Sequence, residues 1–222
     1  VAGTFGASGD NGYGIVGVDW RARLMPVRVL GRCGSGSTVD ITEGMLWAAG
    51  GSIPGVPANP TPARVVNLSI GGPGECTTFE QDAFDEALSR GALVVVSAGN
   101  DNDNADGYSP AGCYGVSTVV ATDPYGYRAS YSNYSAYADI SAPGGDSSRY
   151  TESDGVLSTV DTSSSAPSGN YAYDWKNGTS MAAPHVTGVG SLMLSVNSSL
   201  TPSQMKGIMA DTSSYFASDS VC

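Results

Sequence analysis

The sequence predicts an α/β fold, a doubly wound and mainly parallel sheet with helices on both faces. Four short runs are apolar on both sides, as buried parallel strands are. Helical patterns alternate with these runs through Gly-rich connections, an order typical of parallel sheets. A length of 222 residues suits one domain with a sizeable core, so we interpret residues 1–222 as a single domain. Function in such folds lies at the carboxyl ends of the strands.

The individual strands and helices follow from local patterns. The four apolar runs are residues 24–30, 64–70, 92–97 and 116–121. Between the first two runs, residues 39–49 place apolar side chains on one helix face, namely Ile41, Met45, Leu46 and Ala49. Residues 78–90 form a second helical pattern, which Thr77 or Thr78 caps and Gly91 ends.

Three other segments lack a helix cap or a regular apolar pattern. Residues 1–7 resemble the interior of a helix, but no Ser, Thr, Asp or Asn precedes them as a cap. We therefore expect the domain to be incomplete at its N-terminus. Residues 125–137 and 144–169 are polar and irregular, and we expect them to lie mostly on the surface.

Composition excludes several classes of protein. The formal charge is −11, from 10 basic and 21 acidic residues without a basic cluster, which argues against binding nucleic acid or anionic membranes. A hydrophobic content of 41 % is too high for a disordered chain. No apolar run reaches the roughly 18 residues of a membrane helix. Two lysines and many Ser, Thr, Asn, Gly and Tyr residues favour a secreted protein, although no signal peptide is present.

The four cysteines are widely spaced and contain no C-x-x-C pair. One histidine leaves little material for a zinc site, so we expect two disulfides formed in an oxidising compartment. Three pairings are possible. We favour Cys33–Cys76, because both residues follow neighbouring predicted strands at one sheet edge. Cys113–Cys222 is the remainder, and Cys222 has the alternative of a partner beyond the chain's end.

Two glycine-rich motifs invite different interpretations. Residues 12–17 match the spacing of a dinucleotide fingerprint, but a strand does not precede them, so we reject nucleotide binding. Residues 177–185 read Asn-Gly-Thr-Ser-Met-Ala-Ala-Pro-His, which puts Ser180 at the start of a helix. The helix N-terminus favours an anion beside Ser180, which is consistent with a nucleophile. Ser180 could equally be a simple helix cap.

Asn100 adds a second feature with two interpretations. It follows the predicted strand 92–97, so its carboxamide lies at the functional end of the sheet. There it could donate a hydrogen bond to the oxyanion of an acyl-transfer reaction. The alternative is a turn-forming Asn, since residues 100–104 read Asn-Asp-Asn-Asp-Asn.

These segments resemble the subtilisin-like serine endopeptidases, the subtilases. Residues 178–185 resemble the nucleophile signature, residues 97–100 the oxyanion segment and residues 66–72 a substrate-binding strand. The resemblance covers essentially the whole chain and is strongest to secreted bacterial members with disulfides. It implies a secreted serine endopeptidase acting on proteins or peptides, with Ser180 as nucleophile and Asn100 as oxyanion donor. It also implies synthesis as a zymogen with a folding pro-segment.

The resemblance further implies a set of substrate-binding residues. An edge strand and a second strand would pair with the two sides of an extended peptide, and they contain Gly34, Ser35, Gly36 and Ser69, Ile70, Gly71. Thr38 and Ile41 would line an upstream apolar pocket. The pocket beside the cut would have walls of Ser97, Ala98 and Gly99 and a floor narrowed by Tyr108. Small walls predict broad specificity.

Structural calcium is also implied by the resemblance. The first expected site is the loop 10–15, with ligands from Asp10, Asn11, Tyr13 and Ile15. The second is Asp139 completed by carbonyls near Ala111, Tyr114 and Val116. Asp and Asn are also ordinary loop residues, which is the alternative interpretation.

The chain departs from the family at the catalytic base. Its one histidine, His185, lies five residues after Ser180, roughly 140° around a helix, so the two side chains diverge. The segments that carry the triad His and Asp are absent. The opening Val-Ala-Gly-Thr resembles the residues that directly follow the family's His signature. We expect either a preceding fragment bound as a second chain or further covalent sequence. The alternative is an inert fold that binds extended peptides or adhesion targets without cleaving them.

Overall fold

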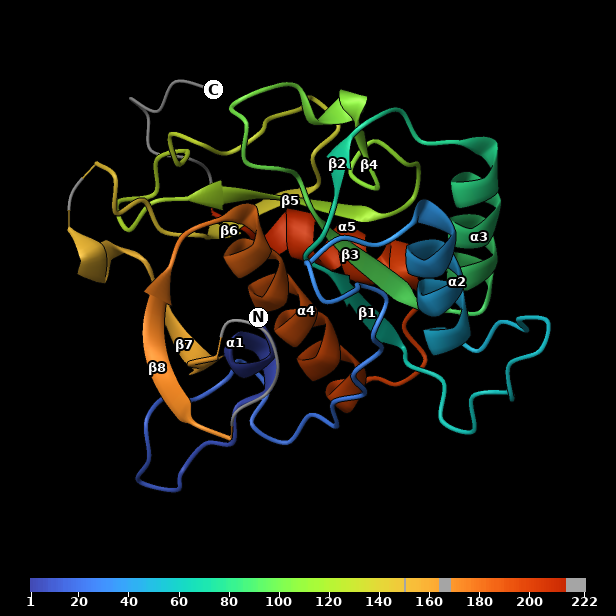
Figure 1. Cartoon of the computed structure of the whole chain (residues 1–222), viewed down its shortest axis with the longest axis horizontal. Helices are drawn as coiled ribbons and strands as arrows, with labels where there is room; N and C mark the ends of the chain where they lie inside the picture. The colour runs from blue at the N-terminus through green and yellow to red at the C-terminus, as the bar shows by residue number, and fades with distance from the viewer. Residues whose placement is uncertain (150, 164–168, 215–222) are drawn as a thin grey trace.

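The computed structural model describes residues 1–149, 151–163 and 169–214, and its centre is a parallel sheet (Figure 1). The strand order is β1-β3-β5-β6, with bounds Val65–Leu68, Leu93–Ser97, Ser117–Thr122 and Ile140–Pro143. All three neighbouring pairs run parallel. The predictions for 64–70, 92–97 and 116–121 are therefore confirmed.

Helices cover both faces of this sheet, which confirms the predicted doubly wound fold (Figure 1). Helices α2 (Thr38–Ala48) and α3 (Thr78–Ser89) pack on one face, and α4 (Thr179–Val196) and α5 (Pro202–Thr212) on the other. Strand β3 shows why. Val94 and Val96 belong to the core under α2 and α3, while Leu93 and Val95 belong to the core under α4 and α5.

Side-chain caps fix where three of these helices begin. Ser37 accepts a hydrogen bond from the Asp40 amide at the start of α2. Thr77 with Glu80 and Thr201 with Gln204 form capping boxes at the starts of α3 and α5. Helix α4 differs, because its N-cap is Gly178 with φ +148° and no side chain caps it.

The remaining elements are short or lie at the periphery. Helix α1 (Ala2–Gly6) has no side-chain cap, as the sequence predicts, and packs against α4. Strands β2 (Gly72–Pro73) and β4 (Tyr108–Ser109) pair antiparallel, as do β7 (Val156–Asp161) and β8 (Tyr171–Lys176). Two 3₁₀ turns, η1 and η2, span Ala105–Gly107 and Glu152–Asp154. The expectation that 144–169 is irregular is wrong for β7, because a polar hairpin lacks an apolar strand signal.

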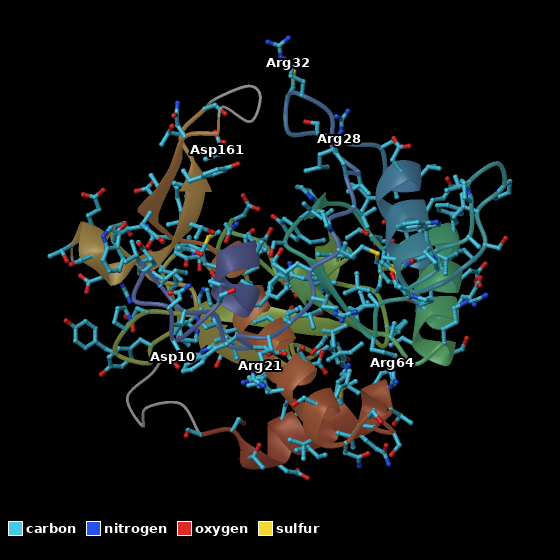
Figure 2. The ribbon with its side chains drawn as sticks, turned by 90° about the horizontal axis from the view of Figure 1, so that it is seen from below. Asp10, Arg21, Arg28, Arg32, Arg64 and Asp161 are labelled. Atoms are coloured by element: carbon cyan, nitrogen blue, oxygen red, sulfur yellow. A yellow bond between two sulfur atoms is a disulfide. The ribbon has the colours of Figure 1, made fainter. Side chains whose placement is uncertain are left out.

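The predicted strand at 24–30 is wrong. Within the described ranges this segment pairs with no other strand, and the outer edge of β1 is unpaired as well. A cavity of about 550 Å³ separates the two, lined by Leu24–Leu30 on one side and Val65–Ile70 on the other. The sequence is strand-like, but a strand needs a ladder partner. Arg28 projects from this segment and Arg32 from the loop that follows it (Figure 2).

The predicted disulfide pairing is also wrong. Cys76 is bonded to Cys113, with a Cα–Cα distance of 5.2 Å, and Cys33 is free and exposed. The reason is tertiary. Gln81 in α3 exchanges hydrogen bonds with the backbone of Tyr114, which brings the loop carrying Cys113 against the start of α3. Cys222 lies outside the described residues.

The described residues contain neither a membrane-spanning helix nor a metal-binding cluster of side chains. They contain no helix with the length and apolarity needed to span a bilayer. They also contain no group of three or more His, Cys, Asp or Glu side chains arranged to hold a metal ion.

Candidate active site

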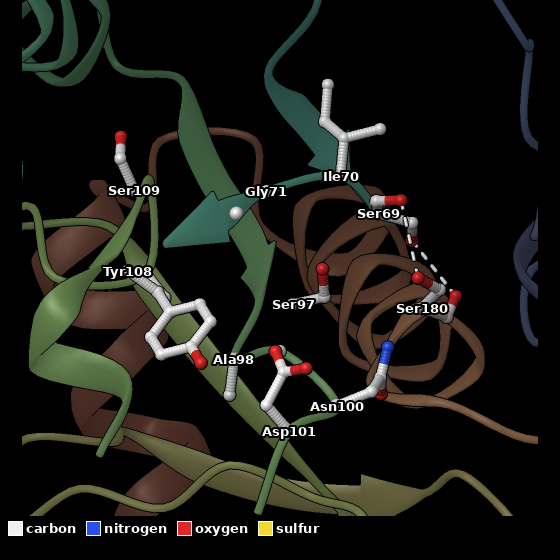
Figure 3. Close-up of a pocket in the computed structure, with 13 residues that line it drawn as sticks. Ser69, Ile70, Gly71, Ser97, Ala98, Asn100, Asp101, Tyr108, Ser109 and Ser180 are labelled. Carbon is white, nitrogen blue, oxygen red and sulfur yellow. Dashed lines mark hydrogen bonds between the residues drawn. The ribbon is translucent and has the colours of Figure 1, made fainter. Parts of the chain in front are cut away.

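Ser180 lies in the first turn of α4, and its hydroxyl does not cap the helix. Instead Ser180 Oγ donates to the carbonyl of Ser69, at 3.3 Å. Ser69 Oγ in turn donates to the Ser180 carbonyl, at 2.9 Å. This reciprocal pair ties the start of α4 to the segment that follows β1 (Figure 3). The capping interpretation of Ser180 is thereby excluded.

The Asn100 side chain has a fixed orientation. Its Oδ1 accepts hydrogen bonds from the Thr179 amide (2.8 Å) and from Thr179 Oγ1 (3.0 Å). Because the oxygen is engaged behind the pocket, the amide nitrogen points into it beside Ser180 (Figure 3). Thr179 itself is fully buried, so the donor pair that holds Asn100 is rigid.

A second donor lies next to the Asn100 amide. The first amides of an α-helix have no intrahelical acceptor, and Ser180 is in that turn of α4. The helix N-terminus also carries a partial positive charge. A small anion at this point would therefore meet the Asn100 carboxamide and a helix-terminal N–H together, which is the arrangement of an oxyanion hole.

A pocket of about 280 Å³ opens beside Ser180 (Figure 3). Residues predicted for the pocket beside the cut gather here, since it is lined by Ser97, Ala98, Gly99, Tyr108 and Ser180, with Ser69, Ile70 and Gly71. Asp101 is the one charged residue in its lining. Burial, reinforced by the nearby Asp101 carboxylate, raises the pKa of Tyr108. The phenol is thus neutral at physiological pH.

Ser109, which lines the pocket beside Ser180, is held in place by a hydrogen bond to Glu80. This buried carboxylate accepts a hydrogen bond from Ser109 and two from Thr77. Burial alone would raise the pKa of Glu80, but these hydrogen bonds more than offset it and hold the pKa below its usual value. Glu80 is therefore ionised while it supports the pocket.

A second cavity of about 530 Å³ adjoins the first and shares Ile70, Gly71, Gly72 and Ser109 with it. It contains the remaining residues predicted to bind substrate, Gly34, Ser35, Gly36, Thr38 and Ile41. The sequence resemblance implied an edge strand at 34–36, whereas the described segment is irregular. The neighbouring segment 24–30 is unpaired as well, so neither segment has a strand partner in the described chain.

His185 is not arranged as a base for Ser180. Its Nδ1 lies 2.9 Å from the Met181 carbonyl of the same helix. Burial lowers the pKa of His185, so the ring is neutral at pH 7. Across the part of the chain that the structure describes, the hydrogen-bond partners of the Ser180 side chain include no histidine and no carboxylate.

The two predicted calcium sites look different from each other. In the loop 10–15, Asn11 Oδ1 accepts from the Tyr13 amide and Asp10 is exposed at φ +56°. Asp10 and Asn11 are exposed, and carboxylate and amide oxygens are ligand types that a hard cation takes. At Asp139 the expected ligands do not fit one, because Lys206 Nζ lies 2.8 Å from Oδ1 and 2.7 Å from the Val116 carbonyl.

Sequence reasoning missed two functional neighbours. Thr179 orients Asn100, and its place directly before Ser180 in the helix-start motif was the available signal. Asn67 links the site to the middle of α4, because it donates to Ser69 Oγ and accepts from Thr187 Oγ1. A polar Asn inside an apolar strand run was the signal for this second residue.

Comparison with known proteins gives one family. The model of the subtilase family matches residues 1–221. An extracellular basic protease of Dichelobacter nodosus is 46 % identical over 220 residues, and an extracellular protease of Xanthomonas campestris pv. campestris is 45 % identical over 213. The matches cover 97 % and 96 % of this chain but 35 % of each relative's length.

A solved structure agrees with these relatives. A protease from Pseudoalteromonas arctica superposes with a TM-score of 0.92 at 47 % identity. The match covers 97 % of this chain and 63 % of that one. The chain therefore spans only part of each protein to which it is similar.

Proposed function

Because the chain belongs to the subtilase family, whose members are serine proteases, we propose that it carries the nucleophile and substrate sites of a secreted endopeptidase. The observation that carries the proposal is the pairing of Ser180 with the oriented amide of Asn100. Acyl transfer needs a nucleophile and oxyanion donors on one side of a carbonyl. A protein or peptide is the substrate this arrangement serves.

In the proposed reaction Ser180 Oγ attacks the peptide carbonyl and gives its proton to a general base. The C–N bond then breaks, the base returns the proton to the departing amine, and water later hydrolyses the acyl-enzyme. The oxyanion is received by the Asn100 carboxamide and the Ser180 amide. The Ser69 carbonyl, which now accepts from Ser180 Oγ, is freed to accept from the substrate backbone. An extended peptide would lie across the two cavities, between residues 34–36 and 69–71.

The general base and its orienting carboxylate are proposed to come from a segment preceding Val1. Support comes from the unpaired edge of β1 and the cavity of about 550 Å³ beside it, which Val1 and Ala2 also line. A strand inserted there would pair with β1 and with residues 24–30, and it would cover their apolar side chains. The segment is either continuous with Val1 or held as a separate fragment after a cleavage.

Substrate preference is proposed to be broad, with one bias. Small residues form the wall of the pocket beside Ser180, so side chains of several sizes fit. The Asp101 carboxylate is the one charge in its lining and should favour Lys or Arg over Asp or Glu at the cut. A structural calcium ion in the loop 10–15 and a folding pro-segment also remain proposals.

Cleavage of a peptide library by the complete mature protein tests the function. We expect cleavage that is abolished by Ser180→Ala and that favours basic over acidic residues before the cut. The matched control is Ser195→Ala in the same helix, whose hydroxyl donates a hydrogen bond to the Leu192 carbonyl. Peptide binding without cleavage by the wild type would instead support the non-enzymatic alternative.

A further inference from the structure

The amino ends of β5 and β6 meet at a cluster of oxygen atoms. Val116 directly precedes β5 and Asp139 directly precedes β6. The Asp139 amide and carboxylate both bond to Thr118, with Oδ2 accepting from the Thr118 amide at 2.9 Å. This cluster lies at the amino ends of the strands, whereas Asn100 follows the carboxyl end of β3 and Ser180 lies beside it at the start of α4.

The side chain of Lys206 from α5 fills this cluster. Its Nζ contacts Asp139 Oδ1 at 2.8 Å, the Val116 carbonyl at 2.7 Å and the Gly115 carbonyl at 3.3 Å. An ammonium has three N–H donors, so all three are used. Lys206 and Asp139 are 23 % and 24 % exposed, so the pair is largely shielded from water.

The other oxygens predicted to bind calcium have donors as well. The Ala111 carbonyl accepts from Thr118 Oγ1 at 2.8 Å, and the Tyr114 carbonyl accepts from Gln81 Nε2 at 3.1 Å. A calcium ion needs oxygens at about 2.3–2.6 Å. To reach Asp139 and Val116 it would have to occupy the space of the ammonium and face its charge. The residues present therefore do not fit the metal.

We propose that Lys206 is a resident cation, which neutralises Asp139 and gathers the Gly115 and Val116 carbonyls as a calcium ion otherwise would. The consequence is that this part of the fold does not depend on calcium. Through its contacts with Val116 and Asp139 the lysine also attaches α5 to the sheet, beside Met205, which is fully buried in the core under β3. Removing the side chain should leave one carboxylate and two carbonyls around a vacated space, which is a weak site for a hard cation.

The test compares the complete wild-type protein with Lys206→Ala by calorimetric titration with CaCl₂ and by thermal melting. We expect Lys206→Ala to bind one more calcium ion per chain than the wild type, with an affinity of about 10⁻⁴–10⁻³ M. In EDTA its Tm should fall by roughly 3–8 °C, and calcium should restore most of that loss.

Asp139→Asn separates this site from the loop 10–15. In the wild type it should leave the number of bound calcium ions unchanged, and combined with Lys206→Ala it should remove the additional ion. If Lys206→Ala does not fold, Lys206→Gln provides a shorter neutral side chain for the same titration. The proposal is overturned if Asp139→Asn removes a calcium ion from the wild type, or if neither lysine variant gains one.

Discussion

The Ser180 region and the Asp139 region lie at opposite ends of the strands of one sheet. They differ in how many of the groups that each site needs come from the described chain. At Ser180 the described chain supplies a hydroxyl, an oriented carboxamide and two substrate cavities, but no base. At Asp139 it supplies the carboxylate, the carbonyls and the balancing cation. We propose that a group from outside the described chain completes the first region, and that Lys206 takes the place of the calcium ion that the resemblance implied for the second.

Comparing the two regions shows under which conditions the role of a residue can be inferred from a sequence motif. In the Ser180 region the nucleophile and the residue that orients Asn100 are adjacent, since residues 178–185 contain both Ser180 and Thr179. The Asp139 region is assembled from three segments, and the deciding residue comes from α5. A local motif cannot reveal a side chain that arrives from a distant helix.

The largest expected effect is at Ser180. In the complete protein Ser180→Ala should lower kcat by about 10⁴- to 10⁶-fold, the range known for triad substitutions in subtilisin. Lys206→Ala, assayed in calcium, should leave kcat within about twofold. Steady-state kinetics on a peptide substrate measure both, and equal losses would contradict the independence of the two regions.

Asn100→Ala should lower kcat by about 10²–10³-fold with little change in KM, the loss known for the corresponding donor in subtilisin. Thr179→Val should give a smaller loss of the same kind, because the amide of Asn100 would lose one of the two donors that orient it. Thr179→Ser keeps that donor and should recover most of the activity. A Thr179→Val effect confined to KM would exclude the positioning role.

The disulfide should affect stability and leave the chemistry intact. Cys76 and Cys113 are 37 residues apart, and opening a loop of that length should lower the free energy of unfolding by about 3–4 kcal/mol. Chemical denaturation of Cys76→Ser/Cys113→Ser measures the loss. Cys33→Ser is the matched control, and we expect its change to stay within about 0.5 kcal/mol, as for other surface substitutions.

The smallest effect concerns His185. Burial lowers its pKa in the folded state below the unfolded value near 6.5, so the unfolded chain binds more protons as the pH falls. His185 should therefore reduce stability progressively below about pH 6.5. His185→Gln should flatten the dependence of Tm on pH between about 5 and 7. It should also leave the pH–rate profile unchanged, and loss of the acidic limb, along which a catalytic base becomes protonated, would identify His185 as the catalytic base.

Sequence patterns predicted most of the central fold because its signals are local. The cap at Thr77 and the apolar run at 92–96 need no distant partner to be recognised. The prediction for residues 24–30 failed for the opposite reason, since a strand needs a ladder partner and this segment pairs with no other strand of the described chain. The disulfide failed likewise, because Gln81 and Tyr114 decide which cysteine approaches Cys76.

The candidate site was predictable in its residues but not in its geometry. Ser180, Asn100 and the cavity residues were identified from motifs, and the structure brings them together. The orientation of the Asn100 amide follows from the buried Thr179, and the sequence alone does not contain that contact. Lys206 had no sequence signal at all, since a lysine on a helix is ordinarily solvated.

Covalent labelling of the complete mature protein with a fluorophosphonate probe tests the central claim most directly. The claim is that Ser180 is a nucleophile completed by a segment preceding Val1. Intact-mass analysis with N-terminal sequencing should find that segment, covalent or bound, together with one adduct on the peptide containing Ser180. An unlabelled Ser180 in a folded sample that contains the preceding segment would contradict the claim.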